Sequence, residues 1–430
     1  MIDSEVEKAA EYITSESQEV TLGESPNWTG KIFKAFPAFA HRNYQLYFSG
    51  QLVSLIGTWL QTVGQGWLVF KLTNSAFLVG LVTALGALPI MAFALLGGVV
   101  ADRFDKRKVL IFTQSASMML AFTLGFLDIL GIIKVWEIAV LAFLLGTVNA
   151  IDTPTRQAFV VEMVGRRSLP SAIAMGAGTY NAARAIGPGF AGFLIAVIGV
   201  GATFILNGIS FIGVIIALFK IKAKSIRANV HPNPVVAIKS GVSYAFSHPK
   251  IRLILVFCSI TSVFGWSYTT IMPVVAKNVF GFGPAGLGLL YSSSGLGALV
   301  GSIAISIFST KVNPKFFIFG GNFLAMSTLI LFTFTSNIYL ALIILFFSGF
   351  GLLCQFATMN SSIQHMVDDG FRGRVLSMYT LAFLGMSPIG SFQIGYVAQR
   401  LGVEFAIRYG AVVSLVFGLF FAYNFRKISS

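Results

Sequence analysis

Apolar stretches of about 20 residues recur along almost the whole chain, and each is long enough for an α-helix to cross a bilayer. The 430 residues are 56% hydrophobic and 11% charged, whereas a soluble domain carries roughly a quarter charged residues. Seven of the 16 acidic residues lie in the first 25 positions, so the remaining chain holds only nine carboxylates. This pattern excludes an ordinary soluble core and predicts an all-α membrane protein.

The apolar stretches predict twelve transmembrane helices in two sets of six. The first set covers Tyr44–Phe70, Ser75–Val100, Val109–Leu130, Val135–Ile151, Ser171–Val197 and Ala202–Phe219. The second set covers Leu253–Val275, Gly286–Phe308, Phe316–Thr335, Ile338–Met359, Leu376–Val397 and Phe405–Tyr423.

The positions of Lys and Arg predict the orientation, because cytoplasmic loops are enriched in these residues. With the N-terminus inside, 24 of the 30 cations fall in cytoplasmic segments and five fall outside, while Arg184 lies within a span. We therefore expect both termini in the cytoplasm and a multi-pass protein of the inner (plasma) membrane. The same placement accounts for the net charge of +14 without nucleic acid as a partner.

The spans and the charged segments predict four parts. Residues 1–42 form an acidic tail, expected to be disordered, followed by a helix on the membrane surface. Residues 43–220 form the N-terminal six-helix bundle, and residues 253–425 form the C-terminal one. Residues 221–252 form a cytoplasmic linker, and the loop from Lys220 to Arg252 carries seven cations.

The two bundles are expected to be pseudo-symmetric. The polar and aromatic patch Gly57–Thr62 in the first span has a counterpart in Gly265–Thr270 of the seventh. Pro188 and Pro388 interrupt the fifth and eleventh spans, 200 positions apart. Interrupted helices at corresponding places in two halves point to a transporter's binding site.

The segment after the second span reads GGVVADRFDKRK, from Gly97 to Lys108. It resembles the motif G-x-x-x-D-R-x-G-R-R of the major facilitator superfamily. The matching residues are Gly98, Asp102, Arg103, Lys106 and Arg107, whereas Asp105 replaces the second glycine of the motif. The resemblance implies the major facilitator fold.

We interpret this segment as a cytoplasmic latch. A carboxylate at Asp102 is suited to a helix N-terminus, and the cations can pair with Asp152 near the end of the fourth span. The residues expected to take part in gating also include Arg156, Arg372 and Arg374.

Three further segments narrow the resemblance. They are DTPTRQ from Asp152, NAARAIGPGFAG from Asn181, and Gln364 with DDGFRGRV from Asp368. Together they resemble the branch of the superfamily that includes the enterobactin exporter and drug–proton antiporters. The resemblance runs from about Phe36 to the end of the chain.

Arg184 is a cation within a span, where a charge is costly and therefore a candidate for function. Tyr180 and Asn181 precede it by four and three residues, on the same helix face. This group suits an anionic or aromatic ligand. Equally, Arg184 can be a structural residue that donates to carbonyl groups of a neighbouring helix.

Polar and aromatic residues in spans one, four, seven and ten are further candidates, because the resemblance implies that these spans line the cavity. The set consists of Thr58, Gln61, Gln65, Asn149, Trp266, Tyr268 and Gln355. The alternative is that these groups form hydrogen bonds between helices. If protons drive transport, the expected carboxylates are Asp152 and Asp128, because mid-membrane positions offer none.

These features predict a secondary active transporter that exports small amphipathic or anionic molecules, such as drugs or siderophores, by proton-coupled antiport. An importer, or a flippase for lipid-like molecules without proton coupling, remains the alternative. The four histidines lie in the tail or in loops and form no catalytic cluster, so an enzyme is not expected. We expect a monomer in the lipid bilayer that binds a small molecule, with no cofactor, metal or nucleic acid.

Overall fold

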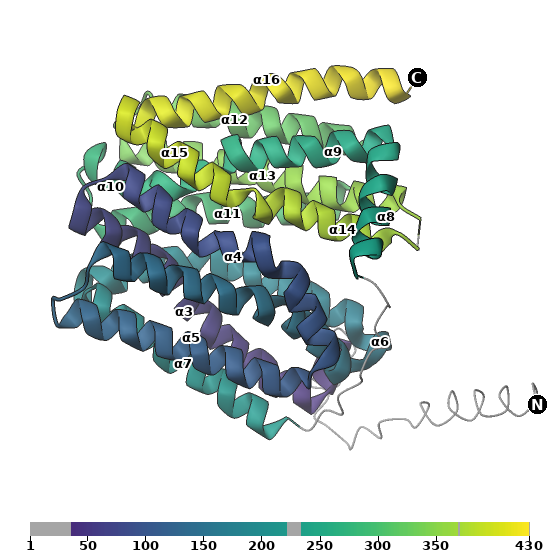
Figure 1. Ribbon diagram of the computed structural model, residues 1–430. Coiled ribbons are helices and arrows are strands. Elements are labelled where there is room, and N and C mark those ends of the chain that lie inside the picture. Colours follow the sequence, from purple (N-terminus) through teal and green to yellow (C-terminus); the bar gives the residue numbers. More distant parts are fainter. Residues whose placement is uncertain (1–35, 222–233, 369, 430) are drawn as a thin grey trace, which may run out of the picture.

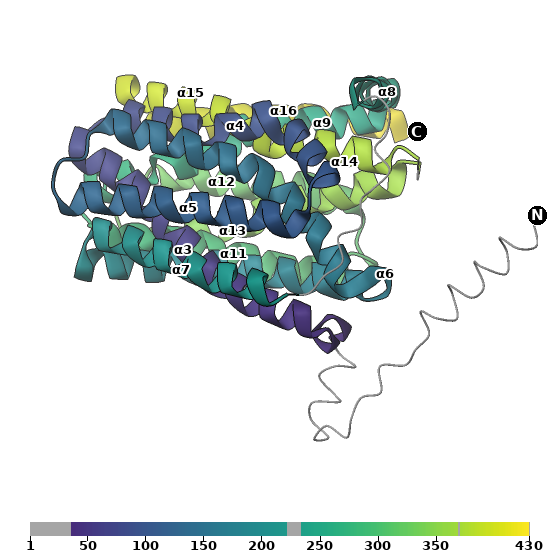
Figure 2. The same cartoon turned by 60° about the horizontal axis from the view of Figure 1, so that its bottom comes forward.

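The computed structural model describes residues 36–221, 234–368 and 370–429, and every regular element in these ranges is helical. Figures 1 and 2 show long helices that run side by side in two groups. The predicted tail, apart from its last residues, and much of the predicted linker lie outside the described residues. Of the predicted surface helix, the structure describes the short 3₁₀ helix η1 (Pro37–Ala40).

The first group lies in the lower part of Figure 1. It contains α3 (Arg42–Thr73), α4 (Ala76–Arg103), α5 (Lys106–Ile129), α6 (Val135–Ile198) and α7 (Val200–Lys220). We call it the first half.

The second group lies above it in the same view. It contains α8 (Pro234–Ser247), α9 (Pro249–Ile260), η2 (Thr261–Trp266), η3 (Ser267–Ile271), α10 (Met272–Asn278), α11 (Pro284–Phe308), η4 (Phe316–Gly320), α12 (Gly321–Phe332), α13 (Ile338–Met366), α14 (Arg372–Thr380), η5 (Leu381–Gly385), α15 (Ser387–Leu401) and α16 (Val403–Ser429). We call it the second half.

Nine helical segments in the described ranges are long and apolar enough to cross a membrane. This confirms the prediction of an all-α membrane protein in its coarse form. One of the nine is α6, whose 64 residues contain the predicted fourth and fifth spans. Its helix breaks at Gly165, where φ is +66°, a conformation that glycine adopts without steric cost. Glu162 lies in α6, three residues before this break.

The helix ends follow from local hydrogen bonding. Ser75, Asp105 and Asn337 each precede a helix, and their side chains accept from backbone N–H groups of the first turn. Such caps satisfy donors that the helix itself leaves unpaired. The first helix ends at Asn74, whose φ of +51° turns the chain back.

The seventh predicted span is not a regular helix. It begins as α9, passes through a π-helical turn (η2) and a 3₁₀ turn (η3), and ends as α10. Pro273 lies in the first turn of α10, where its missing N–H costs least. π-Helical segments often occur at functional sites, and this one contains Trp266.

The two halves meet closely at the end of the molecule that carries the turns at 74–75, 130–134, 199 and 402, which we call the closed end. There Gly80 of α4 faces Gly395 of α15, and Gly192 of α6 faces Gly288 of α11. Small residues allow helix backbones to approach in this way. The side-chain oxygen Oε1 of Gln399 accepts from Ser75 Oγ at 2.9 Å and from the Phe77 N–H at 3.3 Å.

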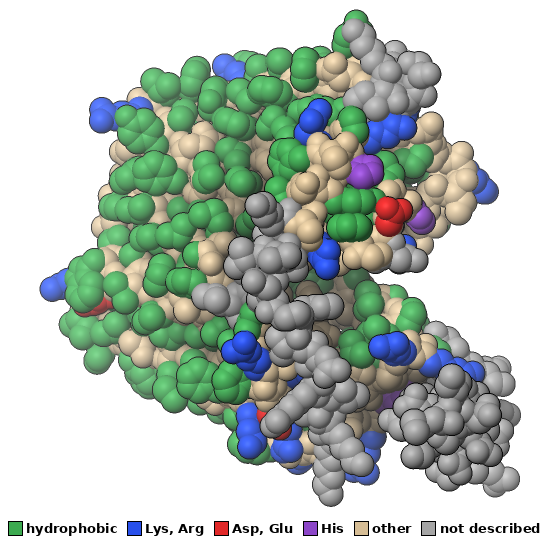
Figure 3. All heavy atoms as spheres, turned by 45° about the vertical axis from the view of Figure 1, so that its right-hand side comes forward, with side chains coloured by type: hydrophobic (Ala, Val, Ile, Leu, Met, Phe, Trp, Pro, Cys, Tyr) green, Lys and Arg blue, Asp and Glu red, His purple; other side chains and the backbone are tan. Residues whose placement is uncertain are grey.

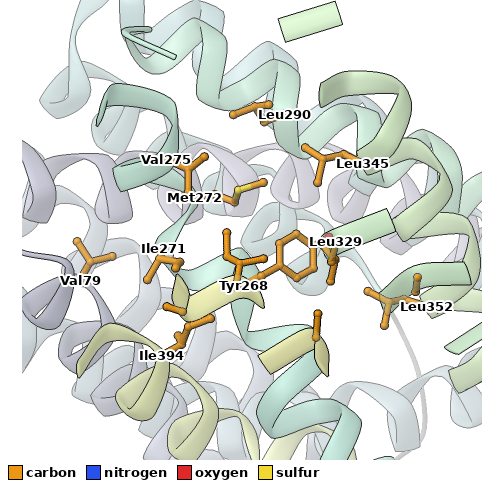
Figure 4. Close-up of a cluster of buried hydrophobic side chains, with 14 of the residues drawn as sticks. Val79, Tyr268, Ile271, Met272, Val275, Leu290, Leu329, Leu345, Leu352 and Ile394 are labelled. Atoms are coloured by element: carbon orange, nitrogen blue, oxygen red, sulfur yellow. The ribbon is translucent and has the colours of Figure 1, made fainter. Parts of the chain in front are cut away.

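Buried apolar side chains continue across this contact. Figure 4 shows Val79 of α4 and Ile394 of α15 beside Ile271, Met272 and Tyr268 of the interrupted helix. All belong to one buried cluster. Close packing of this kind resists small displacements, so the closed end is a well-defined contact between the halves.

Replacing Gly80 with alanine is expected to weaken this contact. A Cβ there would lie 2.5 Å from the Ser391 carbonyl oxygen and 2.8 Å from Gly395 Cα, so α4 and α15 must move apart. Overpacking of this kind costs about 1–3 kcal/mol. Pulsed electron paramagnetic resonance between spin labels on Leu72 and Tyr339 should show a new population at longer distance.

Gly213→Ala in α7 is the matched control, because a Cβ at Gly213 meets nothing within 4 Å. It should leave the distance distribution unchanged. An unchanged distribution in the Gly80→Ala protein would contradict the role assigned to this contact.

Candidate substrate cavity

A cavity of about 440 Å³ lies between the two halves, beneath the closed end. Both halves contribute side chains. The polar and aromatic ones include Thr58, Gln61 and Gln65 of α3, Asn149, Tyr180 and Arg184 of α6, Ser262, Trp266, Thr269 and Thr270 of the interrupted helix, Tyr291 and Ser294 of α11, and Ser387 and Ser391 around α15. Figure 3 shows a hollow between the halves at the opposite end, partly behind grey atoms. We call that end, with the turns at 104–105, 248 and 367–371, the cleft end.

Seven of the ten predicted binding residues line this cavity. They are Thr58, Gln61, Gln65, Asn149, Tyr180, Arg184 and Trp266. The other three are not among the lining residues. Asn181 donates to the Ala177 carbonyl within its own helix. Tyr268 is 2% exposed and its hydroxyl contacts Ser294 Oγ at 3.0 Å.

Gln355, the third, belongs to a buried polar network in the second half. Its Nε2 donates to Thr261 Oγ1 at 2.9 Å, and its Oε1 accepts from Asn322 Nδ2 at 3.2 Å. Asn322 also donates to Ser414. The network therefore connects four helical segments, and the alternative reading of hydrogen bonds between helices applies to Gln355.

A second polar pair joins α3 and α7 in the first half. Asn207 Nδ2 donates to Gln61 Oε1 at 2.5 Å, and Ser210 Oγ donates to the Asn207 carbonyl oxygen. This pair fixes the Gln61 amide at the cavity wall. Neither Asn207 nor Asn322 was predicted from the sequence, although a single Asn within an apolar span is a usable signal.

Arg184 lies in α6 and faces the second half. Its guanidinium carbon is 4.5 Å from the centre of the Trp266 ring, which is a cation–π contact. Trp266 is held in turn by edge-to-face contacts with Phe356 and Phe383. In the described part of the chain Arg184 has no ion pair with a carboxylate. The alternative role is donation by Arg184 to carbonyl groups of a neighbouring helix. The described contacts of Arg184 include no such hydrogen bond.

The charged residues after α4 differ from the predicted latch. Lys106 Nζ pairs with Glu162 of α6 at 2.7 Å rather than with Asp152. The reason is depth, because Asp152 contacts Thr113, seven residues beyond Lys106 and so about 10 Å further along the helix. The pair joins α5 to α6 within the first half.

Two other residues of the motif also act differently from the prediction. The cap of α5 is Asp105, which accepts from the Lys108 N–H, whereas Asp102 and Arg103 are exposed at the end of α4. Arg107 donates to the Leu218 and Phe219 carbonyl oxygens at the end of α7, where a cation is favoured.

The glycine that permits close packing of α4 against α6 is Gly97, and not the predicted Gly98. A Cβ on Gly98 would meet nothing within 4 Å, whereas one on Gly97 would lie 3.2 Å from Ile151 Cα and closer still to the Ala150 carbonyl. Gly97 therefore sets the contact between α4 and α6.

Asp152 is 1% exposed and lies between α5 and α6. It accepts from Thr113 Oγ1 at 2.7 Å and from Gln114 Nε2 at 2.8 Å, and it forms an ion pair with Arg156. A buried charge requires such partners. Asp128 is half-buried in α5 near the closed end, and neither carboxylate is among the residues that line the cavity.

At the cleft end, α8 contacts the segment that contains the predicted gating residues of the second half. Arg374 donates to Ser240 Oγ at 3.0 Å. Tyr244 donates to Asp368 Oδ2 at 3.0 Å, and its ring stacks on Phe371. Arg372 is exposed. The role of these residues in gating stays a prediction.

Comparison with known proteins identifies the family. A family described as transmembrane secretion effectors matches residues 34–429. The chain belongs to this family. The staphyloferrin A transporter of Staphylococcus aureus is 24% identical over 385 residues, which cover 89% of this chain and 96% of the relative. The macrolide efflux protein A of Streptococcus pyogenes is 20% identical over 85% of this chain and 92% of its own.

A third relative supports the resemblance to the branch of the enterobactin exporter. The enterobactin exporter EntS of Salmonella choleraesuis is 22% identical, with 85% of this chain and 86% of the relative covered. These relatives are transporters of the major facilitator superfamily. This secretion effector is therefore a membrane transporter and not an enzyme. Its described residues contain no group of three His, Cys, Asp or Glu side chains suited to a metal ion.

Solved structures show the same fold. The nucleoside transporter NupG has a TM-score of 0.69 at 11% identity and covers 87% of this chain and 98% of its own. A bacterial homologue of the lysosomal transporter Spinster, solved in an inward-facing and unoccupied conformation, has a TM-score of 0.68 at 13% identity, with coverage of 88% and 94%. At these identities the likeness extends to the fold alone.

We predict that Asp152→Asn destabilises the secretion effector. The substitution removes the charge that Arg156, Thr113 and Gln114 solvate, and hydrogen bonds to a charged group contribute about 1.5–3 kcal/mol. The free energy of unfolding in detergent should therefore fall by about 2 kcal/mol. Asp102→Asn, at an exposed position, serves as the control and should leave stability unchanged. Equal stability of both variants would show that the Asp152 cluster has no structural role.

Proposed function

We propose that this protein is a secondary active exporter of small amphipathic or anionic molecules that works by alternating access. In this proposal it crosses the inner (plasma) membrane twelve times, with both termini in the cytoplasm, and acts as a monomer. The count treats α6 as two spans and joins the interrupted segments into single spans. The positive residues then place the cleft end on the cytoplasmic side.

The cavity between the halves carries the proposal. It is lined by polar groups on both halves, and glycine contacts join the halves at the closed end. A site at the interface of two structural repeats is the arrangement by which transporters expose a substrate to one side at a time. Opening the α4–α15 and α6–α11 contacts while closing the cleft would expose the same cavity to the other side.

The relatives guide the choice of substrate and direction. A siderophore transporter, a macrolide efflux protein and an enterobactin exporter are named among them. These names point to organic molecules as substrates. A mixed lining of hydroxyl, amide, aromatic and aliphatic groups suits molecules of this type.

Proton exchange is the driving reaction in the proposal. The sequence contains no nucleotide-binding P-loop of the GxxxxGK[ST] type. Asp152 and Asp128 remain the candidates for proton binding. Because neither lines the cavity, their protonation would act on substrate through helix movement rather than by direct contact.

Everted membrane vesicles test direction and coupling together. Respiration acidifies their interior, and an exporter should then accumulate radiolabelled staphyloferrin A, enterobactin or a macrolide in the vesicle interior. Accumulation should stop when a protonophore collapses the gradient, and substrate should release protons from the vesicles. Loss of preloaded substrate instead of accumulation would indicate an importer. Uptake that continues in the presence of the protonophore would rule out proton coupling.

A matched pair of threonines tests the cavity. Thr58 and Thr123 both donate to the carbonyl four residues earlier, but Thr58 lines the cavity and Thr123 lies exposed on α5. Thr58→Val should lower the initial rate of transport roughly two- to tenfold, the effect of one lost hydrogen bond. Thr123→Val should transport at the parental rate. Equal rates in both variants would argue against this cavity as the transport site.

A further inference from the structure

Among the residues that line the cavity, Arg184 is the one whose side chain carries a charge. A charged side chain at membrane depth is costly and is found where it pairs with another group or faces a water-filled cavity. No carboxylate is among the described residues that line the cavity, and the two described ion pairs use other residues. The positive charge is thus left for a ligand to neutralise.

The stacking on Trp266 leaves the hydrogen-bonding edge of Arg184 available. A guanidinium has five N–H donors, whereas the contact with Trp266 is made by its central carbon, 4.5 Å from the centre of the ring. Such a group can stack and bind a carboxylate through two parallel hydrogen bonds at the same time. The contact holds the guanidinium beside Trp266, and the described residues show no hydrogen bond from its donors.

The backbone around Arg184 is held equally firmly. Pro188, four residues later, has no N–H, so the Arg184 carbonyl lacks its helical donor. Gly295 of α11 packs against this turn, and a Cβ on it would lie 2.8 Å from Ala185 Cα. One residue beyond Pro188, the Gly189 N–H donates to Ser292 Oγ at 2.8 Å. The position of Arg184 is therefore set by the contact between α6 and α11.

We propose that Arg184 on Trp266 forms an anion subsite that selects molecules carrying a carboxylate beside an apolar part. The inference rests on the proposed function and narrows its substrate class. Arg184 belongs to the first half and Trp266 to the second, so a bound carboxylate touches a pair that spans both. Leu55, Trp59 and Leu145 line the same cavity and supply apolar walls for the rest of the molecule.

Equilibrium dialysis of the purified full-length protein in detergent tests this subsite. The probes are three radiolabelled ligands with the same ring system: 2-naphthoate, the uncharged 2-naphthamide and the cation 2-(aminomethyl)naphthalene. The wild-type protein should bind the anion at least about tenfold more tightly than the amide, because a hydrogen bond between charged groups is stronger than one to a neutral group. The cation should bind most weakly. Absence of this order, or no binding of the anion, overturns the inference.

Arg184→Gln should remove the preference by weakening the binding of 2-naphthoate while leaving that of 2-naphthamide within about twofold. Arg408→Gln is the matched control, because Arg408 also stacks on an aromatic ring, Phe334 at 4.1 Å, but away from the cavity. It should retain the full preference. A preference that survives in Arg184→Gln overturns the subsite. Should this variant fail to fold, the wild-type series alone still decides.

Failure of this inference and failure of the proposed function give different results. Binding is measured without transport, so a protein that prefers the anion but moves nothing in vesicles refutes transport alone. A protein that transports but binds all three ligands alike refutes the subsite alone.

Discussion

Backbone contacts at glycine hold the two halves together at the closed end, and the cavity beneath depends on that closure. Gly80 against Gly395 and Gly192 against Gly288 bring pairs of helices from different halves within van der Waals distance. A membrane offers no hydrophobic force between apolar helices, so this fit of small residues stands in for it. The glycine pairs themselves place no side chain between the helix backbones, and apolar side chains such as Val79 and Ile394 pack beside them. That property suits a contact that must open and close.

Each half contains buried polar networks of its own. Asp152 is surrounded by Thr113, Gln114 and Arg156, and Asn322 connects Gln355 with Ser414. Unsatisfied groups are costly in a medium without water, so each half has its own internal network. The Arg184 guanidinium, in contrast, has no carboxylate partner among the described ion pairs and contacts Trp266 of the other half. A side chain whose polar partners all lie in its own half would not need a ligand to supply one.

The sequence predicted the helical membrane fold, the family and seven cavity-lining residues, because long apolar runs and polar exceptions within them are local signals. It did not predict the partners of the charged residues. Lys106 pairs with Glu162 instead of Asp152 because helix packing sets depth, which spacing along the chain does not reveal. Gln355 and Tyr268 are residue types that suit a binding cavity, but their side chains form hydrogen bonds within their own half. The side of a helix that faces a cavity depends on neighbours that only the fold brings together.

Access to the cavity from the two sides of the membrane is the most direct test of alternating access. Cys258 and Cys354 are buried, so a cysteine at Thr58 reports on the cavity with little background. A membrane-impermeant thiol reagent should label Thr58→Cys rapidly from the cytoplasmic side, in everted vesicles, and slowly from the outside, in whole cells. Adding a transported substrate should raise the rate of labelling from outside. Equal labelling from both sides at all times, or none from either, would contradict alternating access through this cavity.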